Sequence, residues 1–184
     1  MMKATGIVRR IDELGRVVVP KEIRRTLRIR EGDPLEIFTD RDGEIILKKY
    51  SPIGELGSYA QEFVHSLNKT FSVHAAICDK DVFIACSGAI KRELNEKPVS
   101  GDIEEAIINR TPVQYSAEYG DMIRILDNDG KESFTGVSIA PIIALGDPIG
   151  AVVLLNRENT PLSMDAVKSA EMVALFLGKL MEQS

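Results

Sequence analysis

Basic side chains gather near the N-terminus of this 184-residue chain, between Arg9 and Arg30. Residues 1–30 carry nine Lys and Arg against three Asp and Glu, a net charge of +6, whereas the whole chain has a net charge of −5. A guanidinium group neutralises phosphates, and its planar fork also fits two acceptors on guanine in the major groove. The pattern therefore indicates a nucleic-acid-binding segment on an acidic body, with a merely solvated charged surface as the alternative.

No catalytic or metal-binding set accompanies these charges. His65 and His74 have no partner at a fixed spacing, and no glycine-rich phosphate loop follows a predicted strand. The hairpin predicted around the two cysteines places Cys78 opposite Val82. It places Cys86 opposite His74, so the thiols are expected to be small buried groups and not a disulfide. We predict no enzyme activity, no catalytic residues, no metal site and no cofactor.

The first 50 residues read as one unit that positions the basic residues. Segments 4–12 and 15–20 are typical of strands, and a helix is expected over residues 21–29, because Pro20 suits the residue at a helix start. Two further strands follow, joined by the turn "DRDG" at 40–43 and ending near residue 49. The expected apolar interior of this unit consists of Val17, Val18, Val19, Ile23 and Leu27.

Four short strands and one short helix bury little apolar surface, and units of this size are marginal alone. We therefore expect residues 1–50 to be an obligate homodimer, with interleaved hairpins as one arrangement. Each arginine would then appear twice on a two-fold electropositive surface. Residues 51–55 are expected to be a linker, and residues 56–184 a second domain.

The second domain shows an α+β pattern. Apolar helix faces are expected after residue 53 and over about 163–182, with a third helix at 100–110 capped by Ser100. Between them lie strand-like runs at 74–79, 82–88, 122–127, 134–144 and 149–156, which predict an antiparallel sheet flanked by helices. The helix faces are expected to serve the core and also contacts between copies. The residues assigned to those contacts are Leu56, Ala60, Phe63, Leu67, Val173, Leu177 and Leu180.

Residues 5–50, with "TGIVR", "DELGRVVVP", "EIRRTL", "GDPLEI" and "ILKKY" in order, resemble the AbrB family of bacterial transition-state regulators. The resemblance implies a β-barrel dimer with swapped hairpins that binds double-stranded DNA. Its DNA-contacting arginines match Arg9, Arg16, Arg24 and Arg25, with Arg10, Lys21 and Arg28 as weaker additions.

The length of the chain matches longer family members that carry a GAF-like second domain. That resemblance implies a homotetramer and both activation and repression of genes during spore formation. The second domain is then either a sensor for a small-molecule effector, whose identity and binding residues stay open, or only an oligomerisation module. Degenerate DNA sites, chosen partly by shape, are expected.

Two further expectations concern the whole protein. The rival function is an antitoxin-like interaction module built on the same N-terminal fold. The most apolar window, residues 137–155, is interrupted by Gly146, Asp147 and Pro148, so no membrane helix is predicted and a cytoplasmic protein is expected.

Overall fold

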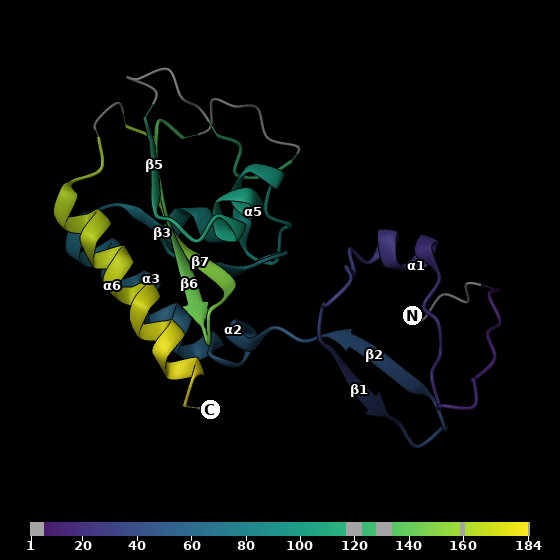
Figure 1. The fold of residues 1–184 in the computed structure, drawn as a ribbon. Coiled ribbons are helices and arrows are strands. Elements are labelled where there is room, and N and C mark those ends of the chain that lie inside the picture. Colours follow the sequence, from purple (N-terminus) through teal and green to yellow (C-terminus); the bar gives the residue numbers. More distant parts are fainter. Residues whose placement is uncertain (1–5, 117–122, 128–133, 159–160, 184) are drawn as a thin grey trace. The chain divides into compact units, whose positions relative to one another are not determined.

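The computed structural model describes residues 6–116, 123–127, 134–158 and 161–183 (Figure 1). The chain divides into two compact units, Met1–Tyr50 and Ser51–Ser184. The fold is α+β, and each unit is described by itself below.

The first unit contains one short helix and one hairpin. Helix α1 (Lys21–Thr26) begins after Pro20, as expected, and the antiparallel strands β1 (Leu35–Thr39) and β2 (Ile45–Lys49) follow. The turn between the strands is closed by Asp40, whose carboxylate accepts the backbone N–H of Asp42 at 3.1 Å and that of Glu44 at 2.9 Å. This is the turn chemistry expected of aspartate.

Segments 4–12 and 15–20 were predicted as strands, but within the described residues 6–20 the chain forms none. A strand exists only when a neighbouring strand completes its hydrogen bonds. Within the described residues of a single copy, no strand pairs with residues 6–20. The β-prone sequence "RVVV" is therefore not part of a sheet in the described structure.

Apolar side chains of the first unit remain on its surface. Among residues 6–50, Pro20 alone is buried. The exposed large apolar residues of this unit are Ile7, Val8, Ile11, Leu14, Val17, Val18, Leu27, Ile37, Phe38, Ile45 and Leu47. A single copy thus has the secondary structure of a domain without its hydrophobic core.

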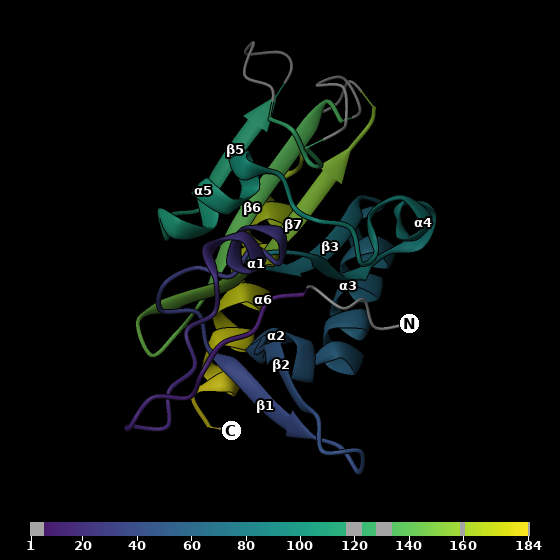
Figure 2. The same ribbon diagram turned by 90° about the vertical axis from the view of Figure 1, so that its right-hand side faces the viewer.

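The second unit is built on a five-stranded antiparallel sheet of order β4-β3-β7-β6-β5 (Figures 1 and 2). The strands are β3 (His74–Asp79), β4 (Phe83–Cys86), β5 (Val113–Ser116), β6 (Gly136–Ala144) and β7 (Asp147–Asn156). The β6–β7 turn needs only Leu145 and Gly146, with φ of 50° and 85°. Two consecutive positive φ values match the twist of a two-residue hairpin.

Helices cover both faces of this sheet. On one face lie α2 (Pro52–Glu55), α3 (Gly57–Phe71) and α6 (Met164–Met181), and on the other lie α4 (Lys91–Leu94) and α5 (Gly101–Ile108) (Figure 1). Successive residues of β3 alternate between two apolar clusters, Ala75 and Ile77 in the first and Ala76 and Cys78 in the second. This two-sided burial explains why the central strands are continuously apolar.

The predicted cap Ser100 is present, and Ser163 caps α6 in the same way. Ser100 Oγ accepts the N–H of Ile103 at 3.3 Å, and Ser163 Oγ accepts the N–H of Ala166 at 3.2 Å. The segment expected to be a linker instead forms α2, and its Ile53 is fully buried. The apolar helix face predicted from Ile53 onward therefore begins inside the segment assigned to the linker.

The helix faces chosen for contacts between copies require correction. Leu56, Ala60, Leu67, Val173 and Leu177 are buried within the second unit, and Phe63 and Leu180 are partly buried against the same cluster. Their spacing is that of a core stripe, and the sheet already fills it. Leu56, Ala60, Leu67, Val173 and Leu177 therefore offer little surface to another copy, whereas Phe63 and Leu180 stay partly exposed.

Three local expectations in the second unit were also wrong. Residues 123–127 form no strand, although Ile123 and Ile125 are buried, and the edge strand β5 was not foreseen. A bulge between Ile77 and Cys78 shifts the β3–β4 register, so that Cys78 pairs with Phe83 and Cys86 with Ala76. Both cysteines are buried free thiols.

Candidate nucleic-acid interface

Helix α1 presents a row of cations to solvent. Lys21, Arg24 and Arg25 are exposed, and among the described residues no carboxylate lies within ion-pair distance of any of them. Ile23, on the same helix, is half-buried, so the helix has one inward position and a cationic remainder. Unpaired guanidinium groups of this kind keep their full charge for an external anion.

Arg28 ends this helix in an unusual conformation. Its φ is 52°, its N–H donates to the carbonyl of Arg25 at 3.3 Å, and the N–H of Ile29 donates to the carbonyl of Arg24 at 2.7 Å. These two bonds form the Schellman cap, whose left-handed residue is usually glycine. An arginine here adopts a backbone conformation that residues other than glycine rarely take.

A lysine–aspartate pair joins the end of this helix to the hairpin. Lys49, the last residue of β2, donates from Nζ to the carbonyl oxygen of Arg28 at 2.9 Å and lies 3.1 Å from the carboxylate of Asp33. Asp33 also accepts the backbone N–H of Arg30 at 2.8 Å. Burial alone would raise the pKa of Asp33, but the Arg30 N–H and Lys49 outweigh it and hold that pKa below its usual value.

The turn that precedes the valine run holds a second arginine. Asp12 accepts the backbone N–H groups of Leu14 at 2.9 Å and Arg16 at 2.8 Å, and its other oxygen accepts Arg16 Nε–H at 2.8 Å. Gly15, with φ of 76°, permits the tight return of the chain. The Arg16 backbone N–H, followed by its side chain, lowers the pKa of Asp12. Arg16 is thus an exposed arginine with a fixed orientation.

The remaining two predicted arginines lie on the extended segment before this turn. Arg9 donates from Nη1 to the carbonyl of Val8 at 3.2 Å, and Arg10 is exposed. The cations were predicted from the sequence, but Asp12, Asp33 and Lys49 were not. These three residues bind the side chain of Arg16 and the backbone of Arg30 and Arg28, respectively. A carboxylate four residues before an arginine, with a glycine between them, was the available signal for the Asp12 turn.

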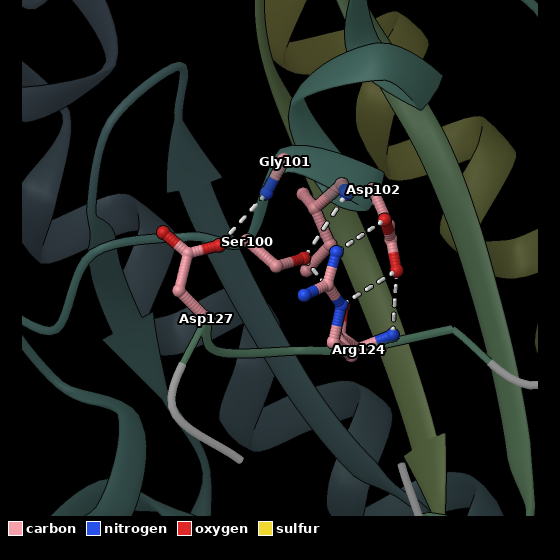
Figure 3. A network of polar contacts seen from close by, with 6 residues as sticks. Ser100, Gly101, Asp102, Arg124 and Asp127 are labelled. Carbon is pink, nitrogen blue, oxygen red and sulfur yellow. Dashed lines mark hydrogen bonds and ion pairs between the residues drawn. The ribbon is translucent and has the colours of Figure 1, made fainter. Parts of the chain in front are cut away.

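The second unit has a polar network of a different kind (Figure 3). Arg124 donates from Nε and Nη2 to the two carboxylate oxygens of Asp102, at 3.4 and 3.3 Å, and its backbone N–H reaches the same carboxylate at 2.9 Å. Ser100 Oγ bonds the carbonyl of Arg124, and Asp127 accepts the N–H of Gly101 at 3.2 Å. The network fastens residues 123–127 to the start of α5, which is a structural task.

The described part of the chain offers little other chemistry. It contains no group of three or more His, Cys, Asp and Glu side chains placed to hold a metal ion. Burial raises the pKa of Cys86 to about 12, and it raises that of Cys78 further, so neither thiol is an available nucleophile. No helix in the described residues is both long and apolar enough to span a bilayer.

Two family models match the chain. Residues 55–182 match the C-terminal domain of stage V sporulation protein T, a transcription factor. Residues 8–55 match MazE, a bacterial antitoxin that recognises its toxin. The first match covers more than half of the chain.

Curated relatives agree with this division. Stage V sporulation protein T of Bacillus subtilis is 52% identical over 183 residues, which cover 99% of this chain and 100% of that protein. The transition state regulatory protein AbrB of the same organism is 69% identical over 51 residues, which cover 28% of this chain and 52% of AbrB.

Solved structures identify the fold of the second unit. The GAF domain of an Acinetobacter phosphoenolpyruvate-protein phosphotransferase superposes with a TM-score of 0.57 at 14% identity, over 74% of this chain and 85% of that one. A type II free methionine-R-sulfoxide reductase from Thermoplasma acidophilum gives 0.55 at 13% identity, over 71% and 96%. At such identity the likeness concerns the fold alone, and that fold is GAF-like.

Proposed function

Because the chain belongs to the stage V sporulation protein T family of transcription factors, we propose that it binds double-stranded DNA through the cations of residues 1–50. It regulates genes of spore formation in this way, as an activator at some sites and a repressor at others. The 69% identity to the AbrB regulator over 51 residues supports a DNA-binding role. The relationship of the whole chain to a sporulation transcription factor, which is not an enzyme, supports the biological setting.

The observation that carries the proposal is the state of Arg24 and Arg25. Both are exposed on α1, and no acidic group of the described chain neutralises them. A surface arginine without a carboxylate partner offers its whole charge to a phosphate, which releases condensed counterions from DNA. Arg9, Arg10, Lys21 and Arg28 extend the cationic surface, and Arg16 adds an oriented guanidinium.

A gel-shift titration against salt tests this role. Arg24→Ala should weaken binding severely and reduce the slope of log affinity against log salt by about 2, because a dimer loses two phosphate contacts. Arg92→Ala, which removes an exposed helical arginine from the second unit, is the matched control and should change neither quantity. Binding that is insensitive to salt, or equally weakened by both variants, would contradict the proposal.

The DNA-binding form is a homodimer assembled through residues 1–50. Eleven large apolar side chains of this unit are exposed in a single copy, and the strand-like segment of residues 6–20 has no strand beside it. A second copy with swapped hairpins supplies both missing parts. Val17, Val18, Val19, Ile23 and Leu27 then form a shared core, and residues 1–50 expressed alone should be dimeric by light scattering.

The second unit joins two such dimers into a tetramer. Tyr59 on α3 and Met172, Leu175 and Phe176 on α6 are exposed, and the rings of Phe63 and Phe176 pack 5.5 Å apart. Positions 172, 175 and 176 share one face of α6, opposite its core stripe. This second apolar face supports a helix contact between copies.

Phe176→Glu tests the tetramer contact. The variant should give a dimer by light scattering while the second unit keeps its secondary structure and melting temperature. DNA fragments with two separated sites should then be bound less tightly than by the tetramer, since the linkage between binding units is lost. An unchanged tetramer would remove this face from the proposal.

A small-molecule effector of the GAF-like unit is a further part of the proposal. A thermal-shift screen of metabolites should find a stabilising ligand, and that ligand should alter DNA affinity by the same factor by which DNA alters ligand affinity. If no compound raises the melting temperature, the unit serves assembly only.

The antitoxin reading is the second candidate, and the match of residues 8–55 to the MazE model favours it. In that reading the N-terminal unit still forms the dimer, and a segment after it captures a toxin. Here the following residues fold into a unit with its own two apolar clusters, which weighs against a toxin-binding tail. Loss of DNA binding without loss of a copurified protein partner would favour the antitoxin role.

A further inference from the structure

Asp12 and Arg16 form an ion pair that stability does not explain. The Arg16 side chain is 69% exposed and that of Asp12 42% exposed, with Nε and Oδ2 2.8 Å apart. An ion pair between such exposed groups contributes little to the folded state. The pair also reduces the net positive charge of the surface on which Arg16 lies. A residue used only to attract phosphates gains nothing from a carboxylate at its guanidinium.

The geometry fits a different use. Asp12 is itself fixed, because the N–H groups of Leu14 and Arg16 both donate to its Oδ1. Its Oδ2 occupies the Nε–H of Arg16, and the two terminal nitrogens of that guanidinium donate no hydrogen bond to the described part of the chain. Those terminal nitrogens are the donors that reach O6 and N7 of guanine together. Asp12 therefore fixes the guanidinium of Arg16 through Nε, and its two terminal nitrogens are left to bind a base.

Arg24 and Arg25 show the contrast. No carboxylate of the described residues restrains either of them, so their long side chains keep their rotational freedom. Freedom suits contacts with phosphates, which lie along the whole DNA backbone and carry no sequence information. Reading a base edge instead requires a fixed direction, and fixing a side chain before binding removes an entropic cost of the complex.

From this contrast we propose that Asp12 is a positioning residue that aims Arg16 at guanine in the major groove. The pair sets the sequence preference of the protein, whereas Arg24 and Arg25 supply attraction that is independent of sequence. The inference rests on the DNA-binding function proposed above. It assigns sequence recognition to Arg16 and phosphate binding to Arg24 and Arg25.

The test uses the full-length protein and a duplex selected from random DNA by the wild-type protein. Its affinity is compared with that for a scrambled duplex of equal composition, and for the selected duplex with 7-deazaguanine in place of each guanine in turn. That base lacks the N7 acceptor. The wild-type protein should lose about tenfold affinity at one or more guanines per half-site.

Asp12→Asn separates positioning from turn formation. Its side-chain oxygen still accepts the Leu14 and Arg16 N–H groups, but the second carboxylate oxygen is gone. The preference for selected over scrambled DNA should fall about tenfold, while the salt slope on scrambled DNA is unchanged. In this variant and in Arg16→Ala, the penalty for 7-deazaguanine should disappear at the same guanine. Circular dichroism spectra matching the wild type exclude a folding defect.

Glu13→Gln is the charge-matched control, because it removes a neighbouring exposed carboxylate that makes no ion pair within the described residues. It should leave the preference intact. Equal loss of preference in Glu13→Gln and Asp12→Asn would overturn the inference, because net charge alone would then explain the effect. A wild-type protein that binds selected and scrambled DNA equally would overturn it too. Absence of all DNA binding at low salt would instead contradict the proposed function itself.

Discussion

The two units of the chain solve the problem of a hydrophobic core in opposite ways. Residues 51–184 enclose two apolar clusters, one on each face of a five-stranded sheet. Residues 6–50 contain one buried residue, Pro20, and leave most of their large apolar side chains exposed. The second unit encloses its core in one copy, whereas the first exposes most of its apolar side chains. Sequence patterns of similar apolar content therefore led to very different burial.

The two units also differ in how their charged side chains are paired. In the second unit, Arg124 is paired with Asp102 to fasten a loop onto α5. In the first, Arg24 and Arg25 have no carboxylate partner in the described chain, whereas Asp12 pairs with Arg16 and Asp33 with Lys49. The first unit therefore combines ion pairs near its turns with unpaired cations on α1.

The largest expected effect comes from Val18→Asp. Val18 is 71% exposed in a single copy, where such a change costs about 0.5 kcal/mol or less. In a shared dimer core it would bury an unpaired charge and cost about 3–5 kcal/mol. We expect loss of the dimer and of DNA binding, measured by light scattering and gel shift. Met164→Asp, at an exposed apolar position in α6, should be neutral and serves as the control.

A smaller but still large effect is expected from Gly178→Ala in the second unit. A Cβ at this position would lie 2.1 Å from the backbone oxygen of Ile143, so α6 must move away from β6. Overpacking of this kind costs about 1–3 kcal/mol. Urea unfolding should show the loss in the second unit at every protein concentration. Gly57→Ala, with open space around its Cβ, should not destabilise α3.

Arg28→Gly should separate stability from binding within the first unit. Glycine adopts the left-handed conformation of this cap without strain, so stability should rise by about 1 kcal/mol. DNA affinity should nevertheless fall, because a cation is lost from the end of α1. The melting temperature and the gel shift should therefore move in opposite directions. A rise in both would show that Arg28 takes no part in DNA binding.

The smallest effect is expected at the β6–β7 turn. Leu145 adopts φ of 50° beside Gly146, a conformation that asparagine accepts far more easily. Leu145→Asn should stabilise the second unit by about 0.5 kcal/mol in urea unfolding, with DNA affinity unchanged. A change in DNA binding would show that this turn influences the first unit.

The sequence was most informative where neighbours along the chain determine the structure. Ser100 was readable as a helix cap, and a turn between the last two strands followed from the break in an apolar run, although Asp147 and Pro148 of that break belong to β7. Each of these features depends on hydrogen bonds or torsions within a few residues. Such local interactions can be predicted from a short stretch of sequence.

Prediction failed where the structure of a segment depends on contacts with residues far away in the sequence. Residues 123–127 look like a strand because Ile123 and Ile125 are apolar, but Arg124 fastens them to α5 as a loop. Phe176 and Leu177 are adjacent apolar residues, and only the packing of α6 on the sheet shows that Leu177 faces inward. For the candidate site, the cations were identified but Asp12 and Lys49 were not. Their role depends on the groups that they bind, the Arg16 side chain and the Arg28 carbonyl, and the sequence does not show these contacts.

The incomplete core of the first unit has a genetic meaning. In the proposed dimer, two copies build each DNA-binding surface, so a chain that folds but lacks its arginines still combines with intact chains. In a cell that makes both in equal amounts, only about one dimer in four would carry two intact halves. A defective allele of this type would therefore be dominant over the normal one. An allele that disrupts the shared core, such as one encoding Val18→Asp, would interfere less with the normal chains, because its product forms no mixed DNA-binding unit with them.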